Sequence, residues 1–321
     1  MEAGIRERGR GEAMAETKTV TMDEQSRTGG EQAARAGVSV VVPAYNEEHG
    51  IGPQIERLRH VMEGCGRAFE LIVVDDGSTD GTAVEAGKHA VRLVQQRRNR
   101  GYGASLKAGI AVAEHDWIVI IDADGTYPAE SIPALLALGD ECDMVVGARV
   151  GEDVNIPWQR RPAKWILAKL ASYLAEQNIP DMNSGLRLLK RPLVDKYEHL
   201  LPSGFSFTTT ITLALLCNDY RVEYVPISYA KRVGSSKIRP GHAYQFLMLI
   251  LRTVMYFNPL RIFLPLGLVF FTYGIGKLGY DIYKENVSES AILGILSAFL
   301  LWGIGLLGDQ ISRFGMFIRK K

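Results

Sequence analysis

The stretch WIVIIDAD, residues 117–124, decides the fold class of this chain. Its first five residues are apolar and mostly β-branched, which is typical of a buried strand. In a parallel sheet, ligands bind at the carboxyl ends of the strands, so the two aspartates should lie side by side at that edge. Mg²⁺ and Mn²⁺ prefer oxygen ligands, which makes Asp122 and Asp124 a candidate metal site. The alternative is a simple strand-end turn, because Asp and Gly are common in turns and Gly125 follows.

Three further segments have a similar form: an apolar run leads into a polar loop and then into a helical stretch. They span residues 38–48, 71–82 and 91–109. Strands that alternate with helices predict an α/β fold, with a mostly parallel sheet flanked by helices. The loops that follow the strands should therefore converge on one edge of the sheet.

Three motifs occur in a fixed order along these loops: V-P-x-Y-N-E at 42–47, V-D-D-G-S-x-D at 74–80 and D-x-D at 122–124. Together they resemble the inverting family-2 glycosyltransferases, and most closely the polyprenyl-phosphate glycosyltransferases typified by dolichol-phosphate mannose synthase. The resemblance covers about residues 38–307. It implies a Rossmann-like GT-A domain, a nucleotide-sugar donor, a polyprenyl (dolichyl or undecaprenyl) phosphate acceptor, and Mg²⁺ or Mn²⁺ as cofactor.

The resemblance also assigns residues to the donor site. Asp122 and Asp124 would hold the metal, and Asp124 would be catalytic. Thr126 is not assigned as a ligand, since Gly125-Thr126 stands where leucine-glutamine is common in the mannose synthases. The turn at 75–80 would also serve the fold by capping a helix. The implied nucleotide-sugar contacts are Pro43, Tyr45, Glu47, Val74, Asp76, Asp122 and Ala123, and Arg149 is a further candidate with a surface salt bridge as its alternative.

Two later segments point to the acceptor. Residues 181–187 look like the family's D-x-x-S-G-[FL]-R, and residues 231–237 resemble its R-x-x-G-x-S-K. Cations, a glycine and hydroxyl donors suit a phosphate oxyanion, although a solvated basic loop would have the same composition. The resemblance implies that Asp181 either orients cations or contacts the sugar. The acceptor phosphate would be bound by Arg187, Arg232, Ser236 and Lys237, and Asp181, Arg187, Arg232 and Lys237 would join Asp124 in catalysis.

The implied reaction needs no general base. A phosphate monoester has a second pKa near 6, so it is largely a dianionic nucleophile at neutral pH. Held in line with C1 of the sugar, it would displace the metal-bound nucleoside diphosphate with inversion.

The C-terminal part differs in kind. Residues 262–282 and 291–309 are strongly apolar and nearly long enough to cross a hydrocarbon core of roughly 30 Å. The alternative is a pair of buried core helices. The predicted organisation is a disordered tail at 1–36, a catalytic domain at 37–240, an amphipathic helix at 241–258 and a two-helix membrane hairpin at 259–321. The helix at 241–258 would lie on the membrane surface or pack on the core.

Basic residues set the expected orientation. They flank the outer ends of the hairpin, whereas the connecting loop holds Lys284 against Glu285 and Glu289. The catalytic domain and both termini should therefore be cytoplasmic. The flanking residues are Arg252, Arg261, Arg313, Arg319, Lys320 and Lys321. Homo-oligomers through the hairpin are possible, because close helix packing is permitted by Gly274, Gly276, Gly294, Gly303 and Gly305.

Other classes are disfavoured. The net charge of +1 says nothing about partners, but the absence of a basic stripe argues against a nucleic-acid polymer. The chain has no P-loop, and GYG at 101–103 lacks the third glycine of a dinucleotide fingerprint. The rivals are a family-2 enzyme acting on a saccharide hydroxyl, whose Q-x-x-R-W is incomplete at 159–162, a non-catalytic nucleotide-sugar binder, and a membrane adaptor. The sugar, the base, the length of the lipid and the oligomeric state stay open.

Overall fold

The computed structural model describes residues 37–149, 169, 171–173, 176–204, 206–228, 241–285 and 288–318, without the side chains of 241–246, 313 and 315–318. The predicted tail at 1–36 lies outside the described residues. The same is true of the predicted acceptor residues Arg232, Ser236 and Lys237.

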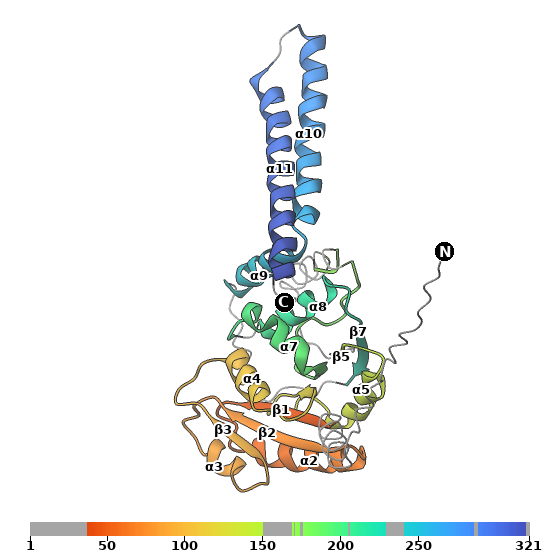
Figure 1. Cartoon of the computed structure of the whole chain (residues 1–321). Coiled ribbons are helices and arrows are strands. Elements are labelled where there is room, and N and C mark those ends of the chain that lie inside the picture. Colours follow the sequence, from red (N-terminus) through yellow and green to blue (C-terminus); the bar gives the residue numbers. More distant parts are fainter. Residues whose placement is uncertain are drawn as a thin grey trace, which may run out of the picture.

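Within the described residues, seven strands form one sheet in the order β3-β2-β1-β4-β6-β5-β7 (Figure 1). β1 to β4 pair in parallel, as do β5 and β7, whereas β6 runs antiparallel between β4 and β5. This confirms the predicted α/β class, and the inserted β6 is the feature that the sequence did not predict. The strands are β1 Val38–Ala44, β2 Phe69–Asp75, β3 Arg92–Gln95, β4 Trp117–Ile120, β5 Met144–Arg149, β6 Arg187–Lys190 and β7 Val222–Ile227.

Two apolar clusters lie on the two faces of the sheet, because side chains alternate along each strand. In β1, Val38, Val40 and Val42 pack with residues of α2 and α5, whereas Val41 packs with residues of α4, α7 and α8. The helices are α2 Ile51–Gly64, α3 Thr82–Ala86, α4 Tyr102–Ala111, α5 Ile132–Gly139, α7 Arg191–Tyr197 and α8 Phe207–Leu216, with short 3₁₀ turns η1 Ala129–Ser131 and η3 Glu198–Leu200. Helices on both faces hold the strand ends rigidly.

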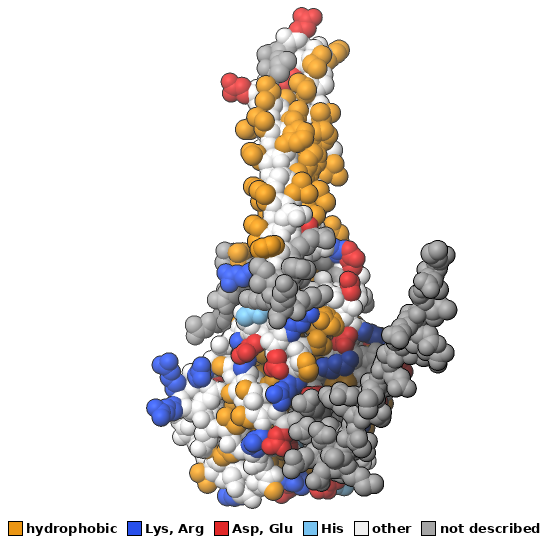
Figure 2. Space-filling view, in the orientation of Figure 1, with side chains coloured by type: hydrophobic (Ala, Val, Ile, Leu, Met, Phe, Trp, Pro, Cys, Tyr) orange, Lys and Arg blue, Asp and Glu red, His pale blue; other side chains and the backbone are white. Residues whose placement is uncertain are grey.

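The chain ends in a hairpin of two long helices, α10 Leu260–Tyr283 and α11 Glu289–Ile318, which project away from the domain side by side (Figure 1). Their outer surface is covered with apolar side chains, and acidic side chains gather at the tip (Figure 2). Both helices are long and apolar enough to cross a membrane, and little of either is buried in the protein. Such exposure does not fit the alternative of buried core helices.

α9, Gly241–Phe257, lies at the base of the hairpin (Figure 1). Ile250, Val254 and Phe257 are buried in the core cluster that also contains residues of α8, while Met248 and Met255 are exposed. One face of the helix therefore packs on the domain, as one of the two predictions had it, and the exposed methionines lie on another face.

The hairpin glycines fall into two groups. Gly274, Gly294 and Gly305 sit where the helices touch: a Cβ at Gly274 would lie 2.8 Å from the backbone nitrogen of Ile295. Gly276 and Gly303 have no atom of the described residues within 4 Å of such a Cβ. Three of the five glycines predicted to permit helix packing thus serve contacts inside one chain.

Candidate active site

The carboxyl ends of β1, β2 and β4 lie at one edge of the sheet, where β1 and β2 end together and β4 ends three residues earlier than β1. Ala44 pairs with Asp75, Val41 pairs with Ile120, and the backbone nitrogen of Ile121 donates to Val41 O at 3.2 Å. The loops that carry the three sequence motifs therefore start from one edge of the sheet, as predicted from the alternation of strands and helices.

The first two motif loops are joined by hydrogen bonds. The backbone nitrogen of Asn46 donates to Ser78 Oγ at 3.0 Å, and that of Glu47 donates to Thr82 Oγ1 at 2.8 Å. Asn46 Oδ1 accepts from the backbone nitrogen of Thr79 at 2.9 Å. Asn46 has a φ of 56°, a left-handed conformation that asparagine tolerates. These polar side chains fix the loops to each other.

Asp76 is buried at the end of β2 and ties it to the loop before α4. Its Oδ1 accepts from the backbone nitrogen of Arg100 at 2.8 Å, and its Oδ2 accepts from that of Gly101 at 2.9 Å. The structure therefore gives Asp76 a role in the fold, which the sequence had assigned to its neighbours. Its contact with the nucleoside stays a prediction.

The other predicted nucleoside residues divide by exposure. Tyr45 is 40% exposed, and Pro43 and Glu47 are partly buried. The side chains of Val74 and Ala123 are buried in the two core clusters. A nucleotide would reach these two residues through their backbone atoms, and their contacts with it stay a prediction.

The two D-x-D carboxylates have different surroundings. Asp122 Oδ1 accepts from the Tyr102 hydroxyl at 2.9 Å. Asp124 Oδ1 accepts from the backbone nitrogen and the hydroxyl of Thr126, at 3.1 Å and 2.6 Å. Asp124 therefore also stabilises the turn after β4, and Thr126 belongs to that turn.

The donor set fits Mg²⁺ or Mn²⁺. Among the residues that the structure describes, no three His, Cys, Asp or Glu side chains form a metal cluster. Two partly exposed carboxylates, completed by substrate phosphates and water, are what Mg²⁺ commonly uses, whereas structural zinc sites need four protein ligands.

The segment 181–187 reaches the same edge. The backbone nitrogen of Gly185 donates to Tyr127 Oη at 2.7 Å, and the Ser184 hydroxyl donates to Gly147 O at 2.5 Å. Gly185 lies so close to Asp122 that a Cβ there would be 2.5 Å from Oδ2. The segment that the resemblance assigns to the acceptor side thus packs directly against a candidate metal ligand.

Asp181 forms a two-pronged ion pair with Arg149. Arg149 Nε and Nη2 donate to its two carboxylate oxygens at 2.6 Å and 2.8 Å, and the backbone nitrogen of Arg149 donates at 3.2 Å. Burial raises the pKa of Asp181, but these hydrogen bonds and the charge of Arg149 outweigh it, so the pKa lies below its usual value. Arg149 thus forms a salt bridge that is partly buried rather than at the surface, and its contact with the nucleotide sugar stays a prediction.

Arg187 is fully buried in β6. Its guanidinium donates to the carbonyl oxygens of Met182 and Ser184, at 2.7 Å and 2.8 Å, and to Thr212 Oγ1 at 2.5 Å. These bonds hold the 181–185 segment in place. The contact of Arg187 with the acceptor phosphate stays a prediction.

Sequence reasoning missed Tyr102, Tyr127 and Thr212. Each makes its contact with a residue far along the chain, so no local pattern reports it. The one available clue for Tyr102 was its position at the start of a helix on the same sheet edge.

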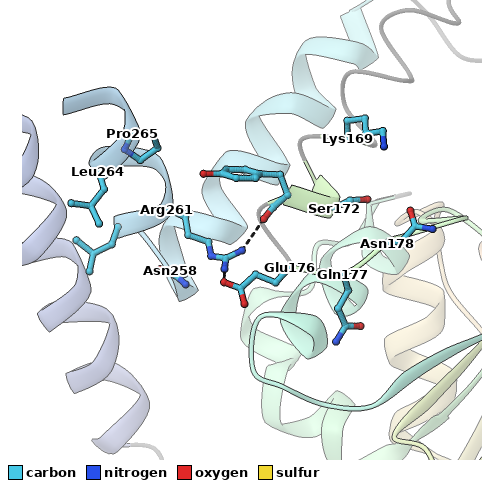
Figure 3. A pocket seen from close by; sticks show the side chains of 11 residues that line it. Lys169, Ser172, Glu176, Gln177, Asn178, Asn258, Arg261, Leu264 and Pro265 are labelled. Atoms are coloured by element: carbon cyan, nitrogen blue, oxygen red, sulfur yellow. Dashed lines mark hydrogen bonds and ion pairs between the residues drawn. The ribbon is translucent and has the colours of Figure 1, made fainter. Parts of the chain in front are cut away.

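A cavity of about 840 Å³ lies where the hairpin meets the domain (Figure 3). Lys169, Asn178 and Arg261 are among its polar residues, and Leu264 is among its apolar ones. The guanidinium of Arg261 donates to Tyr173 O at 2.7 Å and forms an ion pair with Glu176. Charged contacts thus attach the first turn of α10 to the domain.

Comparisons with known proteins agree with this architecture. Residues 39–198 match the family described as glycosyl transferase family 2, and residues 258–314 match the GtrB C-terminal hairpin. A dolichyl-phosphate hexose transferase from Haloferax volcanii is 31% identical over 205 residues, which cover 63% of this chain and 87% of that protein.

The fold is also similar to solved structures of glucosyl-3-phosphoglycerate synthase from Mycobacterium tuberculosis. A complex with Mn²⁺, UDP and phosphoglyceric acid has a TM-score of 0.56 at 23% identity, with 70% of this chain and 82% of that chain covered. A complex with phosphoglyceric acid alone has a TM-score of 0.54 at 25% identity, covering 70% and 83%.

Proposed function

The chain belongs to glycosyl transferase family 2, and from that premise we propose that it transfers a hexose from a nucleotide sugar to a polyprenyl phosphate at a membrane surface, with inversion. One observation carries the proposal: the D-x-D carboxylates and the 181–185 segment meet at one sheet edge, in a chain that ends in an apolar hairpin. The relative whose name includes dolichyl-phosphate hexose transfer supports the choice of acceptor.

On the donor side, Asp122 and Asp124 would hold Mg²⁺ or Mn²⁺ together with the diphosphate. The bound metal would neutralise that diphosphate and stabilise it as the leaving group. Pro43, Tyr45 and Glu47 start from the same edge and would contact the nucleoside. The backbone nitrogens of Arg100 and Gly101 donate hydrogen bonds to Asp76, which fixes the loop before α4 at this edge.

On the acceptor side, the lipid phosphate would act as its own nucleophile, because it is largely dianionic at neutral pH. Arg232, Ser236 and Lys237 would bind it, since Arg187 and Arg149 are engaged with protein oxygens. No described side chain then has to remove a proton. The protein's contribution is to align the phosphate with C1 of the sugar.

The catalytic domain and both termini would be cytoplasmic. Arg252 and Arg261 lie at the base of the hairpin, whereas Glu285 and Glu289 lie near its tip. An excess of basic residues at the base favours the cytoplasmic side of a membrane.

The proposal is tested with the full chain in lipid nanodiscs that contain polyprenyl phosphate. UDP-glucose, GDP-mannose and UDP-N-acetylglucosamine are offered in turn, and nucleoside diphosphate and lipid-linked hexose are measured. We expect release with one donor, only with lipid phosphate, abolished by EDTA and restored by Mn²⁺. Release with a saccharide in place of the lipid would support the hydroxyl-acceptor rival, and donor binding without release would support a binder.

A further inference from the structure

Tyr102 occupies a rigid position at the start of α4. The preceding residue, Gly101, has a φ of 98°, which a side chain would not tolerate, and its backbone nitrogen donates to Asp76. On the other side, the backbone nitrogen of Ala104 donates to Ser203 O at 3.0 Å. The ring of Tyr102 packs against the core cluster around Leu106. These contacts fix the direction of the Tyr102 hydroxyl.

That hydroxyl is aimed at the carboxylate of Asp122, which is confined from several sides. Oδ1 accepts from Tyr102 at 2.9 Å, and the Cα of Gly185 lies against the carboxylate with no room for a side chain. The backbone oxygen of Asp122 accepts from Gln54 Nε2 at 3.3 Å. A carboxylate held in this way presents one orientation to a ligand at the sheet edge.

The hydrogen bond runs in one direction. A carboxylate only accepts, so the phenol must be the donor. The contact is therefore a charge-assisted hydrogen bond.

We propose that Tyr102 is a positioning residue for the metal site, whose hydroxyl orients Asp122 so that Asp122 and Asp124 receive a divalent cation together. This rests on the proposed function, because it assumes that the two aspartates bind metal. Groups that orient a metal ligand from behind reduce the cost of ordering it, and their loss commonly weakens metal binding about 10- to 100-fold.

The test is Tyr102→Phe, which removes only the hydroxyl and keeps the packed ring. Mn²⁺ binding to the full chain in detergent with UDP or GDP, without sugar or acceptor, is titrated by electron paramagnetic resonance. We expect a Kd for Mn²⁺ about tenfold higher or more. The melting temperature and the kcat at saturating Mn²⁺ should stay near wild type. Tyr197→Phe is the matched control, because it removes a phenol from α7 in the same core cluster.

The outcomes are distinguishable. Unchanged Mn²⁺ affinity in Tyr102→Phe overturns the role of Tyr102 and leaves the proposed function standing. If wild type with nucleotide bound no Mn²⁺, the metal assignment and this inference would fall together. A lower kcat that saturating Mn²⁺ does not restore would make Tyr102 a structural residue only. If Tyr102→Phe did not fold, Gly185→Ala would press on the same carboxylate from the other side and should also weaken Mn²⁺ binding.

Discussion

The catalytic domain buries its apolar side chains, whereas the C-terminal hairpin exposes many of them. In the domain, Val40, Ile72 and Ile120 are completely buried, whereas Val269 and Leu300 of the hairpin are 62% and 66% exposed. Leaving such a side chain in water, compared with burying it, costs roughly 1.5 to 3 kcal/mol. The domain is therefore stabilised by excluding water from its interior, and the hairpin is stable where lipid replaces the water outside it.

The two regions also differ in what their polar side chains do. In the domain they gather at the carboxyl edge of the sheet, where they orient one another around Asp122 and Asp124. In the hairpin, Asp281 accepts from the backbone nitrogen of Ser288 at 2.9 Å and pairs with Lys277, which closes the turn between the helices. Catalysis is thus expected from the domain and membrane attachment from the hairpin. Variants in one region should therefore affect one of these two properties and spare the other.

The largest effect is expected at the domain edge. Asp124→Asn removes one ligand charge with little change in volume, so metal and diphosphate should bind more weakly together. Loss of several kcal/mol of charge stabilisation corresponds to a fall in kcat of at least about 10³-fold. The rate of nucleoside diphosphate release, with the melting temperature as a folding check, measures this. Near wild-type turnover at saturating Mn²⁺ would refute the assignment.

Deleting residues 262–321 should preserve the chemistry of the domain but detach the domain from the membrane. We expect the truncated chain to bind nucleotide sugar as before and to use a long-chain lipid phosphate about 10²-fold less efficiently, because it is no longer held at the membrane. A short, water-soluble prenyl phosphate is the control substrate and should be used almost equally by both forms. Undiminished sedimentation of the truncated chain with vesicles would show that α9 is the main anchor.

The two regions also differ in how far the sequence predicts them. The apolar runs at 38–42, 71–74 and 117–121 predict β1, β2 and β4, because a buried strand needs a continuous apolar stretch whatever its partners are. The same argument of length and composition predicts α10 and α11. These elements are specified by their own residues.

The candidate site is predicted only in part. The motif order leads to Asp122 and Asp124, and the structure places both at the expected edge. The partners of Arg187 were not predicted, because Met182, Ser184 and Thr212 meet its guanidinium only in the folded chain. The contact of Tyr102 with Asp122 was missed for the same reason. A polar side chain is explained by distant partners, which periodicity does not reveal.

A smaller effect is expected at the Arg149–Asp181 pair. Asp181→Asn leaves Arg149 partly buried without a full countercharge, which should destabilise the domain by about 1.5 to 3 kcal/mol and slow transfer roughly tenfold. Because the folded pKa of Asp181 lies below its ordinary value of 3.8, the stabilisation is complete above that value and is lost as the pH falls through the folded pKa. Urea unfolding of both forms should give a constant difference from pH 5 to 8. A difference that disappears within that range would contradict the ion pair.

The smallest effect on transfer is expected inside the hairpin, where Gly274→Ala and Gly276→Ala form a matched pair on α10. A Cβ at Gly274 would lie 2.7 Å from Ile295 Cγ1, whereas one at Gly276 meets no described atom within 4 Å. Gly274→Ala should therefore push α11 away at a cost of roughly 1 to 3 kcal/mol, and Gly276→Ala should be neutral or slightly stabilising. Thermal unfolding in detergent compares them, with turnover expected within about threefold of wild type, since the hairpin supplies location only. Equal melting temperatures would show that the glycine contacts do not hold the hairpin together, and loss of turnover in Gly276→Ala would point to contacts of its exposed face with another chain.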